Sequence, residues 1–129
     1  MAGQKRIAFK RTLPGTAEWA YFDEKGCLVV ELYDHSAEAE NWFGGDIATL
    51  VKIHPRDLDR LLRHLRNPNV TPLDDFLGFF RKDSPALSES DRQDEILRRL
   101  EEKFEFSGYF KIQKWLEEKK IRFEKIFEH

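Results

Sequence analysis

The sequence predicts an α+β fold: one antiparallel or mixed sheet of about five strands, with helices packed mainly on one face. Three observations lead to this prediction. Apolar and polar residues alternate as far as residue 54, which is the period of strands. From residue 55 apolar residues recur every three or four positions, as in helices, and the last segment, 121–127, alternates again. Strands that cluster first, with helices after them, are typical of α+β proteins.

The 129 residues favour a single domain, with a β-rich part over 1–54, a helical part over 55–119 and a closing strand over 121–127. A chain of this length buries a hydrophobic core without disulfides. Its 40% of hydrophobic residues are too many for a disordered chain. Two loosely joined parts that meet near residue 70 are the alternative arrangement.

Four strands are expected before residue 54. Residues 6–12 alternate, and the segments 17–23 and 27–34 flank a short turn that ends at Gly26, as in a β-hairpin. The fourth strand, 47–53, is apolar on one face and partly on the other, so it is expected to be central or well covered. The closing strand is expected to join the sheet and hold the terminus in place.

Four helices are expected in the helical part, separated by stretches rich in Pro, Ser and Asn. The corresponding segments are 55–66, 71–82, 88–104 and 107–120. Ser90 and Gln93 have the spacing of a capping box at the start of the third helix. His64 lies among arginines and is expected to be solvated. The predicted inward positions are Leu58, Leu61, Leu62, Leu65, Ile96, Leu97, Leu100, Phe104, Ile112, Trp115 and Leu116.

The charges nearly cancel, with 22 Lys and Arg against 24 Asp and Glu. A strong overall attraction to nucleic acid or to an anionic membrane is therefore not expected. The single cysteine, Cys27, cannot form an internal disulfide, and its apolar surroundings favour a small buried residue over a reactive thiol. No apolar run has the length of a signal or of a membrane span, so a cytoplasmic protein is expected.

The sequence contains no motif for a nucleotide, a catalytic serine or a zinc ion: GxxxxGK[ST], GxGxxG, GxSxG, HExxH and paired CxxC are all absent. The pair Gly44-Gly45 follows a predicted helix, so it fits a helix end better than a phosphate-binding loop. No cofactor and no metal are expected.

Asp34, His35 and His54 are the candidate catalytic residues, because a carboxylate and an imidazole at strand ends suit general base chemistry. With Asp46 they would also make a set of metal ligands, although their spacing matches no known pattern. The structural interpretation is favoured: Asp34 or Ser36 caps a short helix over 37–43. A small enzyme or a ligand-binding protein that uses these residues is therefore the alternative function.

Four arginines recur at helical spacing opposite the leucines of the first long helix. They are Arg56, Arg60, Arg63 and Arg66. Such a face is able to contact phosphates, but Asp57 and Asp59 flank it and no aromatic residues are interleaved. A solvated face with local ion pairs is favoured, and a nucleic-acid binder is a further alternative.

Residues 24–46 carry six carboxylates and one base, Lys25, which is a local excess of five negative charges in a nearly neutral chain. Trp42 lies in the same segment, and an aromatic residue within a charged patch is typical of interfaces. We therefore expect an acidic surface that attracts a basic partner protein. The predicted partner-binding residues are Glu31, Asp34, Glu38, Glu40, Trp42 and Asp46. A homodimer through an exposed edge strand is also considered.

The run "FDEKGCLVVELYDHSAEAENWFGGDIATLVKI", with a leucine-rich helix after it and "WLEEKKIRFEKIFE" at the end, resembles small bacterial α+β proteins. Some of these are similar to the immunity partners of polymorphic or contact-dependent toxins. The resemblance is one of layout over most of the chain, and it assigns no role to a single residue. It implies a protein that blocks a toxin domain through acidic residues facing a basic nuclease site. The leading hypothesis is thus an interaction module, with an immunity-type inhibitor as its specific form.

Overall fold

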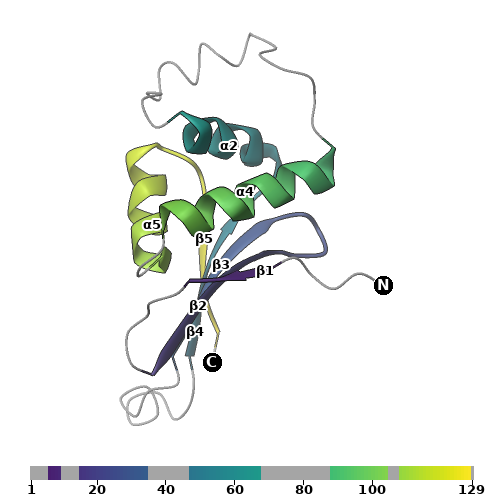
Figure 1. The fold of residues 1–129 in the computed structure, drawn as a ribbon. Coiled ribbons are helices and arrows are strands. Elements are labelled where there is room, and N and C mark those ends of the chain that lie inside the picture. The colour runs from purple at the N-terminus through teal and green to yellow at the C-terminus, as the bar shows by residue number, and fades with distance from the viewer. Residues whose placement is uncertain (1–5, 10–14, 35–46, 68–87, 105–107, 129) are drawn as a thin grey trace.

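The computed structural model describes residues 6–9, 15–34, 47–67, 88–104 and 108–128, and the structural statements below concern these ranges. They form a five-stranded sheet, a 3-10 turn and three α-helices (Figure 1). The strands are β1 (Arg6–Ala8), β2 (Thr16–Phe22), β3 (Leu28–Asp34), β4 (Ile47–Ile53) and β5 (Glu124–Glu128). The helices are η1 (Pro55–Asp57), α2 (Leu58–Arg66), α4 (Glu89–Lys103) and α5 (Gly108–Glu118). The predicted helices over 37–43 and 71–82 lie outside the described residues.

The five strands are ordered β1-β2-β3-β4-β5, and every neighbouring pair is antiparallel. The predicted α+β fold is confirmed, and the sheet is antiparallel throughout. Figure 1 shows the three helices gathered on one side of the sheet. Among the described strands, the closing strand β5 pairs only with β4, so β1 and β5 are the two edges of the described sheet. The outer edge of β5 carries Glu124, Lys125 and Glu128, charges that discourage further strand pairing.

Side chains alternate across a strand, so the pairing register divides the sheet into two faces. The face toward the helices contains Ala20, Phe22, Leu28, Val30, Val51 and Ile53, all of them buried. The opposite face is called the open face here, because none of the described helices belongs to its side (Figure 1). The open face contains Arg6, Ala8, Ala17, Trp19, Tyr21, Val29, Glu31, Tyr33, Ala48, Leu50, Lys52, Glu124, Ile126 and Glu128.

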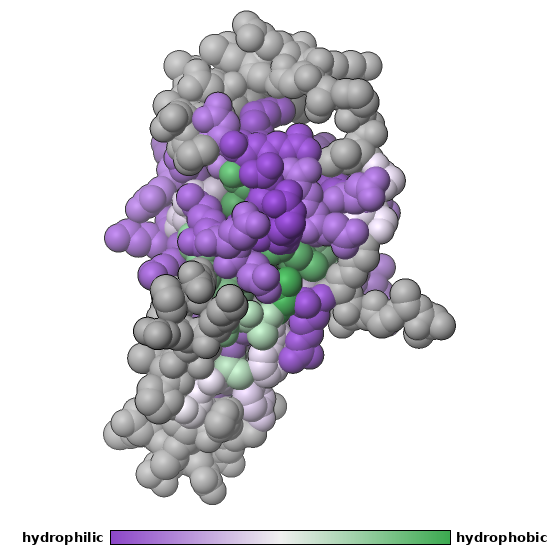
Figure 2. All heavy atoms as spheres, in the orientation of Figure 1, coloured by the Kyte–Doolittle hydropathy of each residue, from purple (hydrophilic) through white to green (hydrophobic). Residues whose placement is uncertain are grey.

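The apolar stripes predicted for the helices are confirmed, because every inward position expected from the sequence is buried in one core shared with the strands. The outer surface of the helical layer is hydrophilic, and apolar residues reach the surface below it (Figure 2). The expectation for His64 is wrong, because its side chain is 0% exposed. It occupies the stripe three positions after Leu61, and its ring meets the edge of Trp115 at a centroid distance of 6.5 Å.

The turn between β2 and β3 forms as predicted. Gly26 has a φ of 80°, a conformation that glycine adopts without steric cost. The side-chain carboxylate of Asp23 accepts hydrogen bonds from the backbone N–H groups of Lys25 and Cys27, both at 2.9 Å. Cys27 is buried, as expected, and burial raises the pKa of its thiol.

The start of α4 differs from the prediction. Ser88, rather than Ser90, is the N-cap, and its hydroxyl accepts a hydrogen bond from the backbone N–H of Asp91 at 3.1 Å. Both serines precede an acidic or amide side chain by three residues, so local spacing alone did not separate them.

A buried carboxylate fixes the start of α5 on the sheet. Glu18 of β2 is 3% exposed, and its Oε1 accepts the backbone N–H of Tyr109 at 2.7 Å. Burial raises the pKa of Glu18, and the hydrogen bond from Tyr109 partly offsets this rise. The preceding residue, Gly108, lets the helix start lie close to the ring of Phe9, because a Cβ at position 108 would be 2.6 Å from that ring. The first turn of α5 is thereby held against β2.

Candidate interaction face and adjoining hollow

The open face has a cluster of aromatic side chains at its centre. Trp19 of β2 and Tyr33 of β3 stack with ring centroids 6.5 Å apart and an angle of 19° between their planes. They come together because Trp19 pairs with Glu31, which places Tyr33 on the diagonal. The guanidinium carbon of Arg6 lies 4.2 Å from the centroid of Trp19, in a cation–π contact. A guanidinium thus already rests on this aromatic surface.

A tyrosine and a carboxylate lie next to these rings. The hydroxyl of Tyr21 donates a hydrogen bond to Oε1 of Glu31 at 3.3 Å. Burial, and then the negative charge of Glu31, raise the pKa of Tyr21 to about 12. The phenol is therefore neutral at physiological pH, and its hydroxyl group orients the carboxylate of Glu31 through the hydrogen bond.

The rest of the open face combines apolar residues with charges. Trp19, Tyr21, Tyr33 and Ile126 are half-buried, although no described helix lies over them. The charged side chains of the face are Arg6, Lys52, Glu31, Glu124 and Glu128. A half-exposed aromatic centre with charges around it is the composition of a protein-binding surface.

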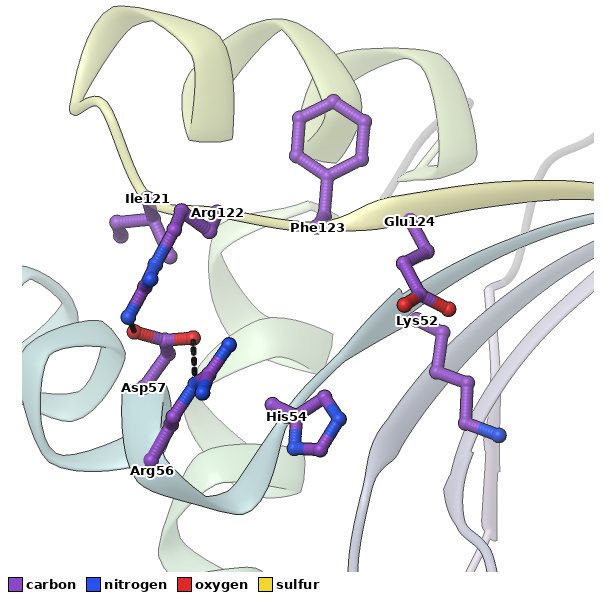
Figure 3. Close-up of a pocket in the computed structure, with 8 residues that line it drawn as sticks. All are labelled: Lys52, His54, Arg56, Asp57, Ile121, Arg122, Phe123 and Glu124. Carbon is purple, nitrogen blue, oxygen red and sulfur yellow. Dashed lines mark hydrogen bonds and ion pairs between the residues drawn. The ribbon is translucent and has the colours of Figure 1, made fainter.

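A hollow of about 440 Å³ adjoins the open face where β4 ends. Figure 3 shows the side chains that surround it, which come from three segments: the end of β4 with His54, the turn η1, and residues 121–124, which lead into β5. Strand alternation places Lys52 and Glu124 on the side of the open face. The hollow is therefore continuous with one end of that face.

Asp57 connects the two arginines that line the hollow. It is only 2% exposed, and its two carboxylate oxygens approach two arginines. Oδ1 lies 3.2 Å from Nη2 of Arg122, and Oδ2 lies 3.8 Å from Nε of Arg56. Figure 3 shows the two arginines reaching the carboxylate from different sides. Both arginine side chains remain 65% exposed, so each guanidinium is anchored on one side only.

Lys52 has a different partner. Its Nζ lies 3.2 Å from Oδ2 of Asp23, and this contact raises the pKa of Lys52. Burial opposes ionisation of Asp23, but hydrogen bonds from Cys27 and Lys52 outweigh it and lower the pKa of the carboxyl. The carboxylate of Asp23, in the hairpin turn, therefore balances the charge of Lys52. Arg56 and Arg122, by contrast, share the single carboxylate of Asp57.

The structure does not bring together the described members of the predicted catalytic site. Asp34 pairs with Ile47 at one end of β4, whereas His54 follows Ile53 at the other end. Six residues of strand separate the two ends, which is ~20 Å at about 3.4 Å per residue. The prediction that Asp34 and His54 share one site is therefore wrong. His35, the third predicted member, lies outside the described residues.

The predicted acidic surface is also divided. Glu31 belongs to the open face, but Asp34, three residues later in β3, points to the opposite side of the sheet. The two carboxylates cannot contact the same flat partner surface. Glu38, Glu40, Trp42 and Asp46 lie outside the described residues, so their part of the prediction stays a prediction.

The arginines of the first long helix contact acceptors within the chain. Arg66 forms two hydrogen bonds of 2.6 Å with the carboxylate of Glu95, and Arg99 donates to the same carboxylate at 2.8 Å. These contacts lower the pKa of Glu95 to about 2. Arg60 donates to the backbone oxygen of Lys120 at 3.4 Å. Arg66 thus pairs with a residue of another helix, whereas a local ion pair of the expected kind joins Arg56 and Asp57 at 3.8 Å. Binding of nucleic acid by this face stays a prediction.

Sequence reasoning missed three buried polar residues: Glu18, Asp57 and His64. A signal existed for Glu18, which falls on the same alternating face as Ala20 and Phe22. The aromatic cluster was missed for another reason. Trp19 and Tyr33 are fourteen positions apart, and only the register of the hairpin makes them neighbours.

Among the described residues, no group of three or more His, Cys, Asp or Glu side chains is placed to hold a metal ion. Each helix within the described ranges is too short or too polar to cross a lipid bilayer. None of the family models, curated proteins and solved structures compared with this chain matches it.

Proposed function

We propose that the protein is an interaction module that binds a partner protein through the open face of its sheet. The observation that carries the proposal is the stacked, half-buried pair Trp19 and Tyr33, which no described helix covers. Aromatic side chains supply large contact areas at low conformational cost, and they are enriched among the residues that dominate binding energy.

The charges of the open face favour a cationic partner. Three carboxylates, those of Glu31, Glu124 and Glu128, stand against the two bases Arg6 and Lys52. Lys52 is already paired with Asp23. The contact of Arg6 with Trp19 shows that this indole ring accepts a guanidinium, and a partner's arginine would take the place of Arg6 there. Oppositely charged partners also associate faster with such a surface.

An immunity-type inhibitor, the form suggested by the resemblance, is the specific version of this proposal. Its partner would be a toxin domain with a basic active site, which the open face would occlude. Co-expression with the product of the neighbouring gene tests this version, because protection from that product's toxicity is expected. The predicted acidic segment adds a second check: charge reversal at Glu38 and Glu40 is expected to weaken protection.

A photo-cross-linking amino acid at position 33 tests the general proposal in cells. A discrete adduct with a second protein is expected at this position. The matched control carries the same amino acid at position 110, because Phe110 is 52% exposed on α5, in the helical layer. Equal adducts at both positions would show nonspecific contact and contradict the proposal, as would no adduct at position 33.

The purified partner then allows a quantitative test. Trp19→Ala and Tyr33→Ala are each expected to weaken binding about tenfold or more, as hot-spot truncations do. Glu31→Lys is expected to slow association most at low ionic strength. Phe110→Ala serves as the control and is expected to leave affinity unchanged. Binding that tolerates both aromatic truncations would locate the interface elsewhere.

A further inference from the structure

We infer that the hollow at the end of β4 binds a small phosphorylated molecule, with Arg56 and Arg122 as the phosphate-binding residues. The inference does not depend on the proposed protein interaction. It rests on two observations: a hollow of ligand size, and two guanidinium groups fixed at its wall by one buried carboxylate.

The volume of about 440 Å³ lies within the range of small-molecule sites, which is roughly 300–1,000 Å³. The walls combine the two chemistries that such sites use. Ile121, which is buried, and Phe123 contribute apolar atoms to the lining, although the ring of Phe123 packs against the core and points away from Asp57 and His54 (Figure 3). His54, Lys52 and Glu124 supply polar groups around it (Figure 3). A ligand with a small organic body and a charged end fits this combination.

The two arginines, Arg56 and Arg122, indicate that the charged end of the ligand is an anion. Arg56 and Arg122 carry two positive charges, and the buried Asp57 supplies one negative charge. An excess positive charge therefore remains at this wall. Lys52 adds nothing to the excess, because Asp23 balances it. Glu124 lines the hollow as well, so the ligand is expected to present its anion to the arginines and a hydroxyl or amino group to the glutamate.

Asp57 acts as a positioning residue. A guanidinium has five N–H donors in a rigid plane. Arg122 uses one of them in its hydrogen bond to Asp57, and Arg56 approaches the same carboxylate at 3.8 Å as an ion pair. Because both side chains are 65% exposed, donors remain for a ligand. Arginines from two different segments that converge on one point suit a tetrahedral phosphate, whose three oxygens accept from both. A planar carboxylate has only two oxygens and is expected to bind more weakly.

Nuclear magnetic resonance titration of the full chain tests this inference, with inorganic phosphate, glycerol phosphate and acetate added at constant ionic strength. Saturable shifts are expected at residues 54, 56 and 122, with glycerol phosphate binding more tightly than phosphate and acetate binding most weakly. Equal and unsaturable shifts with all three anions would show general charge attraction and overturn the inference.

Two substitutions at Arg122 separate recognition from charge. Arg122→Gln is expected to weaken binding of glycerol phosphate at least tenfold. Arg122→Lys keeps the charge but loses the planar donors, so it is expected to weaken binding by a similar factor. The matched control is Arg98→Gln, which removes an arginine of comparable exposure, 59%, from α4 and its pair with Glu102. Full affinity in Arg122→Lys, or equal losses in Arg98→Gln, would contradict a specific site.

A phosphoserine peptide distinguishes the source of the phosphate. If the peptide binds and glycerol phosphate does not, the ligand is a modified protein and the inference of a small molecule is wrong. If glycerol phosphate binds to the Trp19→Ala variant as to the unchanged protein, the hollow is independent of the aromatic cluster. Failure of the titration would leave the proposed interaction through Trp19 and Tyr33 intact, so the two proposals fail separately.

Discussion

The two faces of the sheet are built from the same strands but differ in the side chains that they carry. The covered face carries mainly aliphatic residues such as Val30 and Val51, which are 0% exposed beneath the helices, together with the buried Phe22 and Glu18. The open face carries Trp19, Tyr33 and charged residues, and its aromatic side chains are half-exposed. Aliphatic side chains interlock well in a dry core. Aromatic residues with polar tips tolerate both water and a partner, so they suit a surface that is covered only part of the time.

Truncation of one residue on each side tests this comparison most strongly. Leu100→Ala removes a side chain that is 0% exposed in the core, and it is expected to reduce the free energy of unfolding by about 3 kcal/mol. Tyr33→Ala removes a larger but half-exposed side chain, and a loss of about 1 kcal/mol is expected. Urea denaturation measures both values. A larger loss for Tyr33→Ala would show that the open face belongs to the stabilising core.

The next largest loss of stability is expected where α5 packs against Phe9. Gly108→Ala places a Cβ 2.6 Å from the ring of Phe9, which is buried and has little room to move. Overpacking of this kind costs about 2 kcal/mol, more than alanine gains as a helix former. Combining it with Phe9→Leu is expected to recover part of the loss, as a double-mutant cycle would show. Additive effects of the two substitutions would contradict the contact.

Two carboxylates are expected to change stability with pH in opposite directions. Burial raises the pKa of Glu18, so its contribution to stability is present below its ordinary value of 4.5 and is lost as pH rises through the raised value. Glu18→Gln keeps an acceptor for Tyr109 and should be more stable than the unchanged protein at neutral pH. The pKa of Glu95 falls to about 2, so its contribution is lost as pH decreases from 4.5 toward 2.

Thermal unfolding across this pH range measures both effects. Glu95→Gln is expected to cost about 1 kcal/mol at neutral pH, because its pair with Arg66 is partly exposed. The cost should disappear in acid. A Glu18→Gln variant that is less stable than the unchanged protein at neutral pH would show that the ionised carboxylate stabilises α5.

The smallest loss of stability is expected from removing one hydroxyl group on the open face. Tyr21→Phe removes the hydrogen bond of 3.3 Å to Glu31, at a site that water partly reaches. A cost of about 0.5 kcal/mol in unfolding free energy is expected. Partner binding should change more than stability, because Glu31 would lose the group that orients it. A loss of stability above that of Leu100→Ala would reverse the comparison between the two faces.

Local periodicity predicted most of the fold. The hairpin around Gly26, the strand over 47–53 and the leucine stripe of α2 follow from patterns within a few residues, and the structure confirms them. Prediction failed where two local patterns competed. Ser88 and Ser90 both have capping potential, and His64 fits both the arginine face and the leucine stripe. Burial in the assembled core decided the case of His64, whereas both serines are exposed and the hydrogen bond from Asp91 identifies Ser88 as the cap.

The sites depended much more on tertiary structure. Sequence proximity suggested that Glu31 and Asp34 share a surface, but alternation along β3 places them on opposite faces. The idea that Asp34 and His54 meet failed because antiparallel pairing puts them at opposite ends of β4. Asp57 and Arg122 are 65 positions apart, so no local pattern indicated their contact.

The sequence by itself therefore determined the kinds of elements, their order and the residues that face the core, because these depend on periodicity over one or two turns. Only the tertiary structure decided which face stays open, which arginines share a buried carboxylate and where the hollow lies. These features arise from strand register and from contacts between distant segments. Such contacts are selected by the packing of the whole core rather than by neighbouring residues.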